Sequence, residues 1–70
     1  MNAITIRVNG EMRQAPAGLN LVQLLRELGY RPELVVVECN GEILPRQGWN
    51  TRLVVESDAL EVVTIVGGGA

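Results

Sequence analysis

Only one stretch of this chain has the residue spacing of an amphipathic helix. Four leucines recur three or four positions apart and form one apolar stripe: Leu21, Leu24, Leu25 and Leu28. Asn20 stands at the N-cap position, Gly29 follows the stripe, and Pro32 blocks continuation. A single helix of about two to three turns can cover only one face of a sheet, so the remaining residues must supply that sheet.

The segments on either side of this helix have strand patterns. Residues 3–8 alternate between apolar and polar, and Asn9-Gly10 predicts a tight hairpin into a weaker strand at residues 11–15, with Met12 on the same face as Ile4, Ile6 and Val8. Residues 34–39 are apolar without alternation, which predicts a strand covered on both faces or largely so. The apolar residues 60–66 predict a last strand with both faces at least partly covered. We expect the last strand to lie inside the sheet.

Between these two apolar strands the pattern is weaker. Asn40-Gly41 is a second turn signal, residues 45–50 predict an irregular or single-turn segment around Trp49, and residues 53–55 predict a short strand. The predicted order is therefore β-β-α-β-β, an α+β fold with a mixed sheet and one helix packed across one face.

Length and composition fit one small domain. The chain has 70 residues, of which 47% are hydrophobic and 20% charged, so a compact core is expected and disorder is not. We assign residues 1–66 to this domain and residues 67–70 to a flexible, glycine-rich C-terminal tail.

Composition also excludes several classes of function. Without histidine, the chain cannot provide Ser-His-Asp or Cys-His catalysis, and its single cysteine, Cys39, cannot form an intrachain disulfide or a zinc site. Six arginines are dispersed among eight acidic residues and lysine is absent, which argues against nucleic-acid binding. No apolar stretch approaches the roughly 20 residues that a membrane helix needs. We therefore expect a cytoplasmic protein with no membrane partner.

The strongest functional signal is the run Gly67-Gly68-Gly69 before Ala70. Because glycine has no Cβ, such a run can pass through a narrow channel and bring its backbone close to a ligand. The reactive group of such a tail is its terminal carboxylate, which becomes a good acyl donor only after adenylation by ATP. That step requires metal and cationic clamps that this chain does not supply, so a separate enzyme is expected to perform it. The alternative is a frayed end without function.

Two segments resemble a known family. Residues 40–49, read as NGEILPRQGW, resemble the N-x-x-I-V-P-R-x-x-W stretch of the ThiS family, the ubiquitin-like β-grasp sulfur carriers of thiamine thiazole biosynthesis. Residues 58–69 are similar to that family's acidic turn, last strand and glycine tail. The resemblance extends over essentially the whole chain.

The resemblance implies a carrier, not an enzyme. An E1-like, ThiF-like adenylyltransferase would activate the terminal carboxylate with ATP and magnesium, and a cysteine-desulfurase relay would deliver sulfur. Gly69 would then carry the thiocarboxylate, while Gly67 and Gly68 thread the partner's active site. The loaded carrier would donate its sulfur to a ThiG-like thiazole synthase. No cofactor would be bound by the carrier itself.

Ala70 departs from the family pattern, which usually ends at glycine. It is removed before activation, accepted as the terminus, or non-native; we favour removal or a non-native residue, because a Cβ would crowd a channel shaped for glycine. Three alternative functions stay open: a sulfur carrier for molybdopterin, cysteine or tRNA thiolation, a ubiquitin-like modifier, and a β-grasp module that binds its partner non-covalently.

Several single residues have a structural and a functional reading. For Cys39 we favour a small buried hydrophobe over a sulfur acceptor, and for Trp49 a core anchor over a partner contact. For Arg46 we favour a structural role, in which it orients its turn or pairs with a carboxylate of this chain, over contact with a partner. The acidic residues Glu56, Asp58 and Glu61 could meet a basic activating enzyme, although such a group is usually just solvated.

Overall fold

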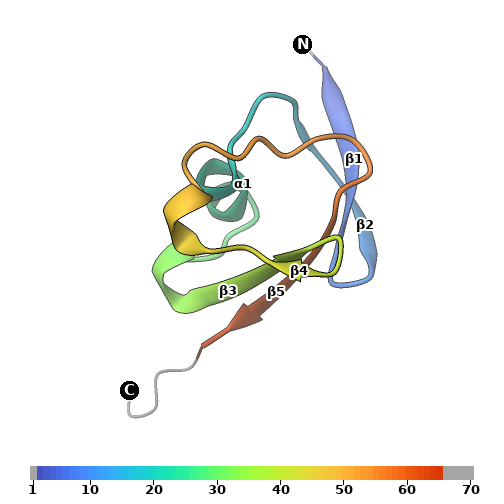
Figure 1. Ribbon diagram of the computed structural model, residues 1–70. Helices are drawn as coiled ribbons and strands as arrows, with labels where there is room; N and C mark the ends of the chain where they lie inside the picture. Colours follow the sequence, from blue (N-terminus) through green and yellow to red (C-terminus); the bar gives the residue numbers. More distant parts are fainter. Residues whose placement is uncertain (1, 66–70) are drawn as a thin grey trace.

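The computed structural model describes residues 2–65 and contains the predicted order of elements (Figure 1). A hairpin of two strands is followed by a helix, a second hairpin and a last strand. Their bounds are β1 (Ala3–Val8), β2 (Glu11–Pro16), α1 (Leu21–Glu27), β3 (Val35–Cys39), β4 (Glu42–Ile43) and β5 (Ala59–Thr64), with 3-10 turns η1 (Pro32–Leu34) and η2 (Arg46–Gly48). The predicted short strand at residues 53–55 is only a bridge between Asn20 and Leu53.

The ends of α1 follow from its sequence. Asn20 and Gln23 form a reciprocal capping box, in which the Gln23 N–H donates to Asn20 Oδ1 at 2.8 Å and the Asn20 N–H donates to Gln23 Oε1 at 2.9 Å. At the other end Gly29 adopts φ 93°, and the Tyr30 N–H donates back to the Leu25 carbonyl at 2.8 Å. The helix is therefore limited to about two turns.

The five strands form one mixed sheet in the order β2-β1-β5-β3-β4. β5 lies in the centre, as predicted, where it runs parallel to β1 and antiparallel to β3. The helix covers one face of this sheet (Figure 1). Between sheet and helix lies the buried core, which contains Ile6, Val8, Ala15, Leu21, Leu24, Leu25, Val35, Val37, Cys39, Trp49, Val54, Leu60 and Val62.

The prediction that residues 34–39 are largely covered on both faces was wrong, and residues 60–65 have one face buried and the other only partly covered. β3 alternates strictly between buried and exposed residues, and β5 buries only Leu60 and Val62. Val36 and Val63 instead lie on the face without the helix, 43% and 57% exposed. A valine-rich strand therefore has the sequence pattern of a strand buried on both faces, even where a single short helix leaves one face of the sheet open.

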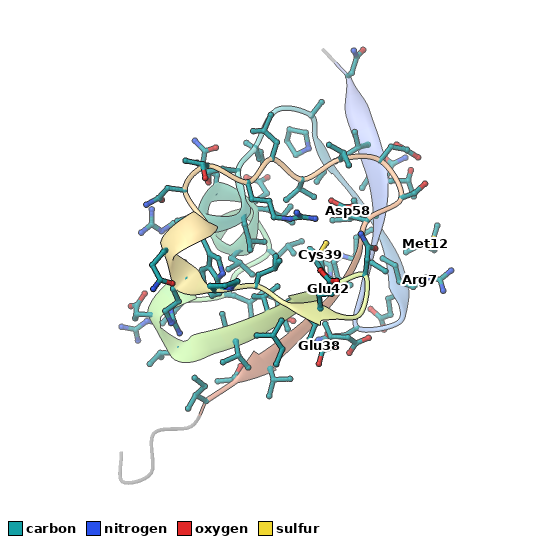
Figure 2. The ribbon with its side chains drawn as sticks, viewed as in Figure 1. Arg7, Met12, Glu38, Cys39, Glu42 and Asp58 are labelled. Carbon is teal, nitrogen blue, oxygen red and sulfur yellow. The ribbon has the colours of Figure 1, made fainter. Side chains whose placement is uncertain are left out.

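The predicted face of Met12 was also wrong. The hairpin register places Met12 opposite Arg7, on the outer face, and Met12 is 62% exposed. Its sulfur lies 3.7 Å from Arg7 Nη2, a contact that Figure 2 shows at the β1–β2 edge of the sheet. The two-residue Asn9-Gly10 turn pairs Val8 with Glu11, so Met12 lies opposite Arg7 and shares its outer face.

Two asparagines hold the central strand from either side. Asn9 and Asn40 both adopt left-handed backbone conformations, φ 51° and 53°, in the two Asn-Gly turns. The side chain of Asn9 accepts from the Val62 N–H at 2.7 Å and donates to the Val62 carbonyl at 3.1 Å. Asn40 Oδ1 accepts from the Ala59 N–H at 3.0 Å.

Asn9 in effect extends the sheet. β1 and β5 pair through Arg7 with Ala59 and Val8 with Leu60, so the second half of β5 runs past the end of β1. There the Asn9 amide takes the place of a peptide group and satisfies both backbone groups of Val62. Without it, partly buried backbone groups of the central strand would lose their partners.

Replacing Asn9 tests this arrangement. We expect Asn9→Gly, which keeps the backbone freedom but loses both bonds, to lower the free energy of unfolding by about 1–3 kcal/mol. Asn9→Ala should cost more, because alanine also disfavours positive φ. Urea denaturation measures both values. Equal stability of wild type and Asn9→Gly would show that the side-chain bonds contribute nothing.

Candidate functional site

The candidate site is the end of the sheet at which β5 finishes. Thr64 pairs with Val35, and one residue further the Ile65 N–H donates to the Leu34 carbonyl at 2.6 Å. The predicted site residues Gly67, Gly68 and Gly69, with Ala70, follow directly in the sequence and lie outside the described residues. Their roles in sulfur attachment and threading therefore stay predictions, as does the boundary between domain and tail.

Arg46 fixes the strand that lies beside this end. Its guanidinium donates to the Pro32 carbonyl at 2.8 Å and to the Val35 carbonyl at 2.6 Å. It also lies over the ring of Trp49, 4.8 Å from the ring centroid. The contacts of Arg46 are backbone carbonyls and an aromatic face, so of the predicted roles it has the orienting one, and within residues 2–65 it pairs with no carboxylate.

Trp49 anchors the same segment in the core. It is buried, as predicted, and its indole N–H donates to the Leu44 carbonyl at 3.0 Å. The segment Pro45-Arg46-x-x-Trp49, which contains the η2 turn, is thus bonded through Arg46 to Val35, the first residue of β3. We call this arrangement the brace. Since Val35 is the partner of Thr64, this brace supports the end of β5.

The acidic residues before and within β5 do not share one role. Asp58 is buried, contrary to the expectation of a solvated group; its carboxylate accepts from the Val55 N–H at 3.0 Å and from Asn40 Nδ2 at 3.3 Å. Glu56 is exposed and accepts from the Thr5 N–H at 3.0 Å. Of the three, only Glu61 lies on the exposed outer face of the sheet.

Cys39 is buried at the end of β3, which agrees with its structural reading. Figure 2 shows its sulfur on the helix side of the sheet, whereas Glu38 points to the other side. Arg52 Nη2 lies 2.9 Å from the sulfur. Burial leaves the thiol little access to an acyl or sulfur donor.

The remaining electrostatic features are at the surface. Arg31 and Glu33 form an exposed ion pair, with 3.4 Å between Arg31 Nε and Glu33 Oε2. A hydrogen bond with its own backbone lowers the pKa of the Glu33 carboxyl, with a further lowering from Arg31. In residues 2–65 no cluster of three potential metal ligands occurs. Nor does this part of the chain include a helix that is long and apolar enough to span a bilayer.

One pair of residues escaped the sequence analysis. The β3–β5 register places Glu38 directly opposite Glu61 on the outer face of the sheet. No ion-pair partner of either carboxylate occurs within the described part of the chain. The pairing depends on register, so strand patterns alone could not have identified it.

Comparison with known proteins gives consistent results. The model of the ThiS family matches residues 6–69. The crystal structure of a thiamine biosynthesis protein (ThiS) from Geobacter metallireducens superposes with a TM-score of 0.78 at 35% identity, covering 94% of this chain and 100% of that one. The sulfur carrier protein ThiS of Escherichia coli is 28% identical over 64 residues, which are 91% of this chain and 97% of that protein.

A longer relative also matches. A thiazole synthase of Magnetococcus marinus is 42% identical over 64 residues, 91% of this chain. The chain spans only 20% of that protein's length.

The sheet order, the central β5 and the one covering helix define a ubiquitin-like β-grasp domain. Within that class, the family match over residues 6–69 is decisive. The chain belongs to the ThiS family of sulfur carriers.

The brace can be tested by replacing Arg46. We expect Arg46→Lys to lower the free energy of unfolding by about 1 kcal/mol, because a lysine ammonium cannot reproduce the planar fork that reaches two carbonyls and stacks on Trp49. Amide exchange at Ile65 should accelerate as well. Arg13→Lys, on exposed β2, is the matched control. Equal effects of both substitutions would remove the special role of Arg46.

Proposed function

We propose that this chain carries sulfur as a thiocarboxylate on Gly69 and donates it to thiamine thiazole synthesis. The observation that carries the proposal is the family match, which continues through Gly67 and Gly68 and ends at Gly69. The brace beside the end of β5 supports it further, because it holds the partner strand of the segment that precedes these glycines in the sequence. We further propose that Ala70 is removed before activation.

The chemistry has two steps. The Gly69 carboxylate attacks the α-phosphorus of ATP and displaces pyrophosphate, which gives an acyl adenylate. Hydrosulfide then attacks the acyl carbon and displaces AMP, so that one carboxylate oxygen leaves with AMP and sulfur takes its place, with release of a proton. In the cell a cysteine-desulfurase relay would deliver the sulfur as a persulfide, whose outer sulfur displaces AMP to give an acyl disulfide. A second thiol then attacks the other sulfur, so that the S–S bond breaks, a new disulfide forms and the thiocarboxylate is released.

Activation belongs to a second protein. Adenylyl transfer depends on magnesium and cationic groups around the phosphates, which an E1-like, ThiF-like adenylyltransferase supplies together with ATP. The carrier is a co-substrate whose contribution is a narrow peptide end. Because glycine lacks Cβ, this end fits a channel that would exclude bulkier residues.

A thiazole synthase is the proposed acceptor of the sulfur. The ThiS-family match and the similarity to a stretch of the Magnetococcus marinus thiazole synthase support this choice over molybdopterin, cysteine or tRNA thiolation. The long relative indicates that carrier-like and synthase sequences occur in one chain.

Mass spectrometry tests the assignment to Gly69. After incubation with the adenylyltransferase, ATP, magnesium and sulfide, we expect loss of Ala70 and a mass gain equal to replacing one oxygen by sulfur. Gly68→Ala should slow loading by roughly tenfold or more, because misplacing the reacting carboxylate is costly. Gly48→Ala is the matched control, since a Cβ there meets open space.

The other outcomes are equally distinct. Sulfur retained on a chain that still ends in Ala70 would contradict the assignment to Gly69. No ATP-dependent mass change, with the fold intact, would instead favour a non-covalent β-grasp module.

A further inference from the structure

The turn between β3 and β4 contains one of two Asn-Gly sequences. Of the asparagines in the sequence, only Asn9 and Asn40 stand directly before a glycine. The backbone nitrogen of that glycine can attack the side-chain amide of the asparagine, because glycine has no Cβ to obstruct the approach. A Cβ added at Gly10 or Gly41 would meet open space, so their described neighbours do not crowd them. Both turns therefore hold the reactants of a spontaneous reaction.

That reaction is deamidation, and it needs no enzyme. The Gly41 nitrogen bonds to Cγ of Asn40, the bond from Cγ to Nδ2 breaks, and the amide nitrogen leaves as ammonia with the proton that Gly41 gives up. Water then opens the resulting succinimide ring at either carbonyl carbon, which leaves aspartate or isoaspartate. No electrons are gained or lost. Asn40 is exposed, so water reaches it.

The folded structure holds the Asn40 amide away from this attack. Its Oδ1 accepts from the Ala59 N–H at 3.0 Å, and its Nδ2 donates to Asp58 Oδ1 at 3.3 Å. The backbone N–H of Asn40 donates to the Ala59 carbonyl at 2.8 Å, so Asn40 binds both backbone groups of the first residue of β5. The side chain must leave these partners before it can close a ring with Gly41. Opening of the turn therefore limits deamidation.

The two Asn-Gly turns differ in how firmly they are held. β1 and β2 pair over the whole length of both strands, whereas β3 and β4 pair only through Glu38 with Ile43 and Cys39 with Glu42. Asn9 also makes a further side-chain contact, to Tyr30 Oη at 3.3 Å. A short pairing at the edge of a sheet opens more readily than a long hairpin. Asn40 is therefore the more vulnerable of the two.

Asp58 determines what deamidation of Asn40 does to the fold. Its carboxylate is only 5% exposed and receives the hydrogen bond from Asn40 Nδ2. Deamidation replaces this donor by a second carboxylate, and no ion-pair partner of Asp58 occurs within the described residues. Two like charges then face each other where a hydrogen bond had been, which disfavours the folded turn. The start of β5 loses part of its support.

We propose that Asn40 is a site of spontaneous deamidation, which is reached when the β3–β4 turn opens, and that the carboxylate it produces holds the opened turn away from Asp58. Loss of ammonia is irreversible under dilute conditions, so the modified form accumulates with the age of the chain. This site goes beyond the proposed sulfur transport and does not depend on it.

Peptide mapping of the full chain tests the site. The chain is incubated in neutral buffer, digested with trypsin and analysed by mass spectrometry against an unincubated sample. Cleavage after arginine places each asparagine in a separate peptide, so each deamidation rate is measured by itself. We expect Asn40 to react about tenfold faster than Asn9 in the folded chain, whereas in urea their rates should agree within about threefold.

Two results of this mapping would overturn the proposal. Equal rates at Asn40 and Asn9 in the folded chain would show that the short β3–β4 pairing creates no preferred site. A rate at Asn40 that is the same in the folded chain as in urea would show that opening of the turn does not control the reaction.

Variants test the part played by Asp58. N40D reproduces the aspartate product, and we expect it to lower the folding equilibrium constant about tenfold or more in urea denaturation. Adding D58N to N40D should restore most of this loss, measured against D58N alone, because one of the two charges is removed. N50D, which adds the same charge at an exposed asparagine, is the matched control and should change little. A loss in N40D that D58N leaves unchanged would overturn the repulsion.

Discussion

The structure depends on how its central strand is held. β5 has β1 on one side and β3 on the other, yet β1 ends before β5 is fully paired. The amides of Asn9 and Asn40 complete the pairing from two Asn-Gly turns. Each turn therefore reverses the chain and also supplies a hydrogen-bonding group to a strand that is distant in sequence. The last described residues before the glycine run are placed by this arrangement.

The segment that resembles the ThiS family also supports β5, through its neighbour β3. Arg46 and Trp49 do not belong to the predicted chemical end; they brace the first residue of β3, which is the partner of Thr64. A recognisable motif can thus be structural and still serve function, since it orders the segment from which the proposed reactive end departs. Asp58 has a comparable role, because its buried carboxylate fixes the turn that starts β5.

Periodicity predicted the elements well, because strands and helices differ in spacing. The leucine stripe, both Asn-Gly turns and the inner position of β5 were all readable from the chain. What failed was the assignment of faces. Met12 depended on hairpin register, and Val36 and Val63 depended on how much sheet a two-turn helix can cover. The opposition of Glu38 and Glu61 could not be predicted either, because it exists only once β3 and β5 are paired. The glycine roles were suggested by sequence and family alone, and lie beyond residue 65.

The parallel pairing of β1 and β5 has a practical consequence. Since β5 begins beside the end of β1, the start of β1 at Ala3 and the end of β5 at Thr64 point to opposite ends of the domain (Figure 1). An affinity label, a fluorophore or a solid support attached ahead of Ala3 would therefore stand at the opposite end of the domain from Thr64. Such a handle would leave the end of the sheet at Thr64 open to soluble proteins when the chain is immobilised.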